Sequence, residues 1–173
     1  RMLTGKKKWW VWAVGHPEGI HYTIAPSRSH EVAGEVLGEF AGVTMADGYA
    51  AYRTLQKVRK GKGLETFILV ACWAHVRRKF VHCEADYPEA ADIIALIGEL
   101  FDIEREVNEA DWPSEDSRLA ELGRRRATDS KAVLAKIRAW RKGVKPRARS
   151  SFARAVSYMD DLWTRLVVFT TNP

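Results

Sequence analysis

The chain has 173 residues, 46% of them hydrophobic, and a net charge of +6, which together describe one domain, or one domain with an insertion, around a sizeable core. This composition excludes a chain disordered throughout, and two cysteines, Cys72 and Cys83, exclude a disulfide-rich secreted scaffold. No run approaches the ~18 apolar residues of a membrane helix and the N-terminus lacks a signal-peptide pattern, so we expect a soluble, intracellular protein with no membrane partner.

The chain opens with an expected hairpin. Residues 1–8 are basic and polar and predict no element, whereas residues 9–14 (WWVWAV) are apolar on both faces, as in a central strand covered on both sides. After a turn at residues 16–19, residues 20–24 alternate and predict a second, antiparallel strand. The side chains expected on its buried face are Ile20, Tyr22 and Ile24.

Two strand–helix pairs are expected next. Ser29 is a good N-cap for a helix. Its apolar stripe is expected to comprise Val32, Val36 and Phe40. Residues 43–46 predict a strand, and the helix that follows, over residues 50–58, is expected to end in the basic loop 59–63. Residues 67–72 (FILVAC) predict a fully buried fourth strand.

Only helices are expected after this strand. They begin with residues 73–81 and the long amphipathic segment 88–107. A polar segment leads to a further helix, a basic linker covers residues 143–151, and a last helix follows. Its apolar stripe is expected to comprise Phe152, Val156, Met159, Trp163 and Leu166. The sequence therefore predicts an α/β core followed by a helical appendage.

The segment 43–49 (VTMADGY) carries the most suggestive single residue. It places Asp47 at the C-terminal tip of a strand, where ligands gather in open α/β sheets. Asp-Gly is also ordinary turn chemistry, because Gly48 supplies a positive φ. On these residues alone, a plain turn and a functional site both remain open.

Charge is strongly segregated along the chain. Residues 84–121 hold 13 acidic and 2 basic side chains, a net charge of −11, so the remainder carries +17. Such asymmetry is typical of a protein with one polyanion-binding surface, although basic residues also serve simply to solvate helices.

Three motifs stand in an order that resembles the transposases of the insertion sequence 66 family. They are residues 46–52 (ADGYAAY), 72–80 (CWAHVRRKF) and 100–104 (LFDIE). The strand at 9–14 and the helix at 163–166 also occupy the places they have in that family. The resemblance covers nearly the whole chain, and the 72–80 block is its most specific part.

This resemblance implies a DDE-type enzyme of the bacterial cytoplasm, with an RNase H-like core interrupted by a helical insertion. In such enzymes three carboxylates hold two Mg²⁺ (or Mn²⁺) ions that promote phosphoryl transfer on DNA. Asp47 corresponds to the second acid, so it is the expected catalytic residue and metal ligand. The first acid is expected on a strand before Trp9 and the third after the closing helix, both outside this chain.

We therefore expect the isolated chain to bind Mg²⁺ poorly and to cut no DNA. Four other acidic residues lie on helical segments whose polar faces account for them, and none is expected to replace a missing acid. They are Asp102, Glu104, Asp160 and Asp161.

Further candidates flank the second predicted strand–helix junction. Cys72 and His75 are expected near the catalytic face as auxiliary residues that shape the site or contact DNA. Together with His82 and Cys83 they could also form a zinc site, but adjacent His82 and Cys83 point to different sides of a helix, so zinc is not expected. The residues expected to bind DNA phosphates are Arg77, Arg78, Lys79, Lys142, Lys145, Arg147 and Arg149. Trp112, Trp140 and Trp163 could stack on bases, but two of them lie on apolar stripes and are expected in the core.

The sequence therefore predicts an α/β fold, in which a partial RNase H-like mixed sheet with flanking helices covers residues 1–85. A helical insertion and a return helix are expected over residues 86–173. The parent protein would be a transposase that cleaves and joins DNA at transposon ends, assembled as a homo-oligomer. Two alternatives remain: a non-catalytic DNA-binding or assembly module, and an RNase H-like nuclease.

Overall fold

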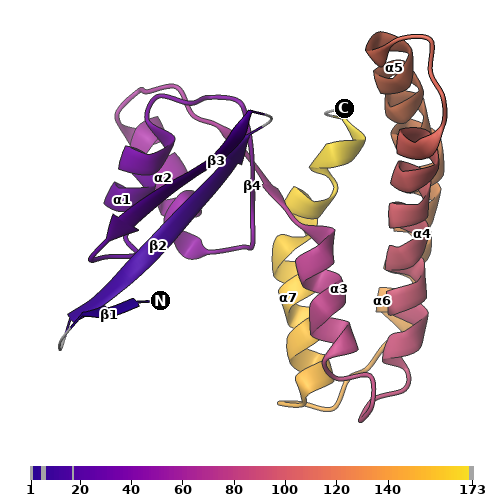
Figure 1. Cartoon of the computed structure of the whole chain (residues 1–173). Helices are drawn as coiled ribbons and strands as arrows, with labels where there is room; N and C mark the ends of the chain where they lie inside the picture. The colour runs from indigo at the N-terminus through magenta and orange to yellow at the C-terminus, as the bar shows by residue number, and fades with distance from the viewer. Residues whose placement is uncertain (1, 5–6, 17, 172–173) are drawn as a thin grey trace. The chain divides into compact units, whose positions relative to one another are not determined.

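The computed structural model describes residues 2–4, 7–16 and 18–171, with side-chain environments from Lys8 onward (Figure 1). The chain divides into two compact units, Arg1–Leu69 and Val70–Pro173, which are described separately. The architecture is α/β, with strands in the first half and only helices after the last strand. The division into an RNase H-like core over 1–85 and an insertion over 86–173 stays a prediction.

The first unit holds two small sheets and two helices. One sheet has the order β1-β2-β3 and the other pairs β4 with β5, which runs across the boundary between the units. The elements are β1 (Met2–Thr4), β2 (Lys7–His16), β3 (Gly19–Ala25), α1 (His30–Leu37), β4 (Val43–Ala46), α2 (Ala50–Gly61) and β5 (Ile68–Ala71).

The hairpin is confirmed, but it begins earlier than predicted. Residues 1–8 were expected to form no element, yet β1 pairs antiparallel with β2, and the register joins Met2 to Trp9 and Thr4 to Lys7. Lysine-rich sequence is compatible with strands at sheet edges, which explains why a polar composition misled the prediction. Pro17, within the expected turn, lies outside the described residues.

The predicted burial of the hairpin is wrong. Ile24 pairs with Val11 and Tyr22 with Ala13, so these side chains share one face, and that face is exposed: Ile24 is 57% and Tyr22 62% accessible. Ile20, expected to be buried with them, is 60% accessible. The opposite face is covered by α1 and α2 (Figure 1). Because adjacent side chains of a strand point to opposite faces, covering one face leaves residues 9–14 only half enclosed.

Two helix ends differ from the predictions because of Gly38 and Arg59. Gly38, with φ of 52°, ends α1, so Phe40 is 49% exposed instead of continuing the apolar stripe. Helix α2 continues to Gly61 through the expected basic loop. Arg59 is buried there, donating hydrogen bonds to the carbonyl oxygens of Phe40 (3.0 Å) and Gly38. A basic residue thus closes the end of α1 from the neighbouring helix.

The second unit is helical. Its elements are α3 (Trp73–Val81), α4 (Ala90–Glu109), α5 (Glu115–Arg125), a π-helical turn η1 (Arg126–Ser130), α6 (Lys131–Gly143), α7 (Ser151–Leu166) and a 3₁₀ turn η2 (Val168–Thr170). Helix α3 lies beside α4 and α7, and α4 lies beside α6 (Figure 1). Within the described part of the chain, no helix has the length and apolar character needed to cross a membrane.

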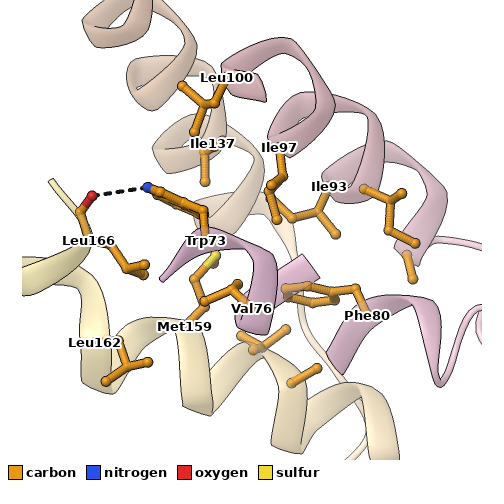
Figure 2. Packing of buried hydrophobic residues seen from close by; sticks show 14 of the residues in the cluster. Trp73, Val76, Phe80, Ile93, Ile97, Leu100, Ile137, Met159, Leu162 and Leu166 are labelled. Atoms are coloured by element: carbon orange, nitrogen blue, oxygen red, sulfur yellow. Dashed lines mark hydrogen bonds between the residues drawn. The ribbon is translucent and has the colours of Figure 1, made fainter. Parts of the chain in front are cut away.

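The core of this unit confirms the predicted apolar stripes of α4 and α7 (Figure 2). Trp73 at the start of α3 donates from Nε1 to the carbonyl oxygen of Leu166 at 2.9 Å, tying α3 to the end of α7 (Figure 2). Trp140 contacts the ring of Phe80, and Trp163 contacts that of Trp73. Both tryptophans therefore pack against the core, as expected.

The sequence pattern did not predict helix α5, because few of its side chains are buried. Among its residues only Leu122 is buried, so its sequence has no apolar stripe. Its N-terminus is nevertheless capped, because the Ser114 hydroxyl accepts a hydrogen bond from the backbone N–H of Ser117 at 3.2 Å. The capping serine after Pro113 was the sequence signal that could have found it.

Candidate functional site

Asp47 stands directly after β4, at the corner where the chain turns into α2. Gly48 has φ of 90°, and the Asp47 Oδ1 atom accepts a hydrogen bond from the backbone N–H of Tyr49 at 3.0 Å. The side chain is exposed, as a ligand of an external cation must be. The predicted strand, turn and helix are confirmed, and the turn fixes the carboxylate at the strand's tip.

The corner is lined by aromatic rings. The Trp12 ring makes edge contacts with Tyr49 and Tyr52, at centroid distances of 6.4 and 6.1 Å. Burial raises the pKa of Tyr52, and the negative charge of Asp47 raises it further. The carboxylate and the phenol therefore interact electrostatically at this corner.

This interaction predicts a measurable titration shift. Because its folded-state pKa lies above its ordinary value, Tyr52 contributes stability that is complete below about pH 10 and is lost as the pH rises through that pKa. In Asp47→Asn the pKa of Tyr52 should fall but remain raised, since burial is the larger cause. Tyrosinate absorbance, corrected with Tyr52→Phe, measures this shift. An unaltered Tyr52 titration in Asp47→Asn, matching the control Asp161→Asn, would contradict the interaction.

A cavity of about 530 Å³ lies within the same unit, between the hairpin and β4. Val14 and His21 border it from the hairpin, and Thr44 and Met45 from β4. The β2 residues beyond Trp9 pair with β3 on one edge, and no strand of the described residues pairs with their other edge. The unpaired edge of β2 and the cavity next to β4 leave space for a further strand between them.

Cys72 and His75 are placed at the start of α3, in the second unit. Cys72 is the half-buried N-cap residue, and the His75 backbone N–H donates to its carbonyl oxygen at 3.2 Å. The Nδ1 atom of His75 is buried and has no hydrogen-bond partner among the described residues. Cys83 is buried, and its burial raises the pKa of its thiol. The auxiliary role of Cys72 and His75 stays a prediction.

Over the residues that the structure describes, no three His, Cys, Asp or Glu side chains gather to hold a metal ion. The Asp47 carboxylate is a hard oxygen ligand of the kind that suits Mg²⁺ or Mn²⁺, and its role as a metal ligand stays a prediction. Asp102, Glu104 and Asp160 form ion pairs with Arg105, Arg126 and Arg141, which accounts for them structurally.

Ion pairs within the second unit neutralise part of the negative charge of residues 84–121. Arg125 and Arg126 pair with Glu106 and Glu104 of α4, both with an N–O distance of 2.7 Å or less. Lys136 of α6 pairs with Glu99 in the same way. The acidic segment therefore neutralises basic side chains of its own unit, and these are poor candidates for DNA contact.

The predicted DNA-binding residues are distributed differently. None of these residues forms an ion pair in the part of the chain that the structure describes. All of their side chains are exposed except that of Arg77, which is half-buried. Lys79 lies over the Tyr158 ring at 5.4 Å, and Arg77 and Arg78 border a shallow hollow on α3. The others lie in or after the last turn of α6: Lys142, Lys145, Arg147 and Arg149. Their charge is available to an external anion, and phosphate binding stays a prediction.

No motif or spacing in the sequence predicts a role for Arg28. Its guanidinium carbon lies 4.5 Å from the centroid of the Trp10 ring and 4.1 Å from that of Tyr49. A single arginine in the loop at 26–29 carried no spacing signal, because its aromatic neighbours lie 18 and 21 residues away in the sequence.

Comparison with known proteins decides the family. The family model described as "Transposase IS66 family" matches residues 2–173, nearly the whole chain. This chain belongs to the IS66 transposase family. The resemblance drawn from the three sequence motifs is thereby confirmed.

Two curated relatives come from Sinorhizobium fredii and carry the names "Uncharacterized protein y4jD" and "Uncharacterized protein y4qI". They are each 33% identical, over 162 and 165 residues that cover 91% and 87% of this chain. The chain spans only about 30% of the length of either relative. No solved structure matches.

Proposed function

We propose that this chain is the central part of the catalytic domain of an RNase H-like DNA transposase, whose parent protein cleaves and joins DNA strands at transposon ends. One observation carries the proposal: within a chain matched by the IS66 family from residue 2 to 173, the exposed carboxylate of Asp47 stands at the tip of β4. We place this activity in the bacterial cytoplasm, where the DNA substrate is found.

Asp47 would act as a metal ligand. When bound, a pair of Mg²⁺ or Mn²⁺ ions would supply the charge that activates the attacking oxygen and stabilises the transition state at phosphorus. The chain contributes a hard oxygen ligand that is charged at neutral pH, held in place by β4 and by the hydrogen bond from Tyr49. The other two acids would come from the remaining parts of the parent.

The unpaired edge of β2 supports an RNase H-like sheet. Strand β1 pairs with β2 from Lys7 to Trp9, and no strand among the described residues pairs with the rest of that edge. A strand preceding Met2 in the parent would continue this pairing along β2 and occupy the space beside β4 that the cavity marks. Such a strand would join the two small sheets and bring the first acid toward Asp47.

DNA would be bound by two basic groups, one on α3 and one around the end of α6, with Cys72 and His75 as auxiliary residues. Replacing Arg77, Arg78 and Lys79 together by glutamine should weaken DNA binding and make it less sensitive to salt. The slope of log affinity against log salt concentration should become shallower by about 0.9 for each phosphate that is no longer neutralised. Fluorescence anisotropy of the parent on transposon-end DNA, across a salt series, measures both effects.

The matched control for that triple variant changes the same charge on paired residues. Arg105, Arg118 and Arg124 each form an ion pair with a residue three positions earlier, and replacing them by glutamine should leave the salt slope nearly unchanged. Equal slopes for the two triple variants would remove the α3 group from the DNA interface.

The experiment that tests the proposed function uses the purified parent with DNA carrying its transposon ends. We expect strand cleavage and joining that require Mg²⁺ or Mn²⁺ and stop on chelation, and no cleavage by the isolated 173-residue chain. Cleavage without joining would favour the RNase H-like nuclease. DNA binding by a homo-oligomer with neither reaction would favour a non-catalytic assembly module, to which the exposed Ile20, Tyr22 and Ile24 could contribute an interface.

A further inference from the structure

Arg28 is held in place by two elements of the first unit. Its guanidinium contacts the rings of Trp10 on β2 and Tyr49 before α2, at 4.5 and 4.1 Å. The Tyr49 hydroxyl donates a hydrogen bond to the Arg28 carbonyl oxygen at 2.6 Å, and Trp12 Nε1 donates to the carbonyl oxygen of Ser27 at 3.2 Å. The loop is thereby fixed to both β2 and the Asp47 corner.

Tyr49 links this arginine to the candidate metal ligand. Its ring contacts the Arg28 guanidinium, and its backbone N–H donates to the Asp47 carboxylate at 3.0 Å. One residue therefore contacts both groups, and the guanidinium and the carboxylate share one corner of the first unit. A phosphodiester that approached Asp47 through a bound cation would meet positive charge there.

The donors of Arg28 are not used within the described residues. No hydrogen bond from its side chain and no ion pair is found there, and the side chain is exposed. A contact between the guanidinium and a ring face consumes none of its N–H donors. The five donors therefore remain available, in the fork geometry that matches phosphate. The rings also reduce the entropy cost of ordering the side chain when it binds a ligand.

Arg59 shows what a structural arginine looks like in the same unit. It is 7% exposed, and both of its terminal nitrogens donate to backbone carbonyl oxygens. Arg28 is fixed instead by aromatic faces, which order the side chain and leave its donors to an external partner.

We propose that Arg28 binds a phosphate of the DNA strand that is processed at Asp47, so that it acts as a catalytic residue by contacting the substrate. The inference rests on the proposed function, because it takes the DNA strand at Asp47 as given. Bidentate hydrogen bonds from the guanidinium to non-bridging oxygens would align that strand for reaction.

The test measures single-turnover cleavage of pre-bound transposon-end DNA by the full-length parent. Arg28→Gln should lower the rate by about 10- to 100-fold, as expected when hydrogen bonds to a charged group are removed. Arg28→Lys should keep part of the rate, because it preserves the charge without the fork. Arg53→Gln is the matched control, since Arg53 is an exposed arginine on α2 that has no ion pair in the described residues.

A set of DNA substrates with one neutral methylphosphonate each identifies the contacted phosphate. At that position the wild-type rate should fall as far as in Arg28→Gln, and the two changes combined should reduce the rate little further. Additive effects at every position, or an Arg28→Gln rate equal to that of Arg53→Gln, would overturn the proposal.

Asp47→Asn separates this proposal from the function on which it rests. If that variant is inactive while Arg28→Gln behaves as the control, Asp47 keeps its role and Arg28 loses its own. If Asp47→Asn cleaves normally, the proposed function itself fails. Thermal melting of each variant checks that any reduction in rate comes from a folded protein.

Discussion

Replacing Asp47 with asparagine should abolish strand transfer by the full-length transposase and leave DNA binding nearly intact. The neutral amide is a poor ligand for Mg²⁺, and removing the several kcal/mol that metal-assisted catalysis supplies lowers the rate by about a thousandfold or more. The amide oxygen can still accept the hydrogen bond from Tyr49, so the turn should survive. Strand-transfer assays and DNA-binding measurements on the same preparation give both readouts.

The matched control is Asp161→Asn, which removes one carboxylate from the exposed face of α7. It should transfer strands at the wild-type rate. Unchanged strand transfer by Asp47→Asn would remove Asp47 from the mechanism.

Replacing Phe80 with alanine should lower the free energy of unfolding of the helical unit by about 3–5 kcal/mol. Phe80 is fully buried on α3, and its ring contacts Trp140 of α6 and Phe152 of α7 at centroid distances of 5.9 and 6.0 Å. The truncation leaves a cavity where three helices meet. Hydrogen exchange of amides in α3, α6 and α7 of the full-length protein reports the free energy of opening.

Val81→Ala is the control for this prediction, because the neighbouring Val81 is 40% exposed on the same helix. It should change the exchange of these amides little. Equal protection in the Phe80 and Val81 variants would show that the α3 contacts do not hold the helices together.

Local sequence was sufficient to predict the corner that carries Asp47. A short apolar run, an Asp-Gly pair and a helical period are all signals within 20 residues, and the structure has β4, the turn and α2 in that order. The apolar stripes of α4 and α7 were predictable for the same reason, because a 3.6-residue period shows which face is buried.

Burial of the hairpin could not be predicted in this way. The alternation of Ile20, Tyr22 and Ile24 marks one face of β3, but an apolar face becomes buried only when another element covers it. Helices α1 and α2 cover the other face, which includes Trp12. Which face they cover depends on the path of the whole chain and not on the strand itself.

Contacts between distant residues explain the other misses. Arg59 was assigned to a basic loop, yet it is buried because carbonyl groups of residues 38 and 40 accept its hydrogen bonds. Arg28 had no recognised role, because Trp10 and Tyr49 meet it only in the folded unit. Helix α5 has little apolar surface, and ion pairs such as Arg125 with Glu106 connect its end to α4.

The role of Asp47 as a metal ligand is tested most directly by a structure of the full-length parent bound to transposon-end DNA and Mn²⁺, with the metal located by anomalous scattering. We expect an ion within direct coordination distance of an Asp47 oxygen, about 2.0–2.2 Å, at the end of β4 and beside a DNA phosphate. An ion bound by other residues, with the Asp47 carboxylate turned away from the DNA, would contradict it.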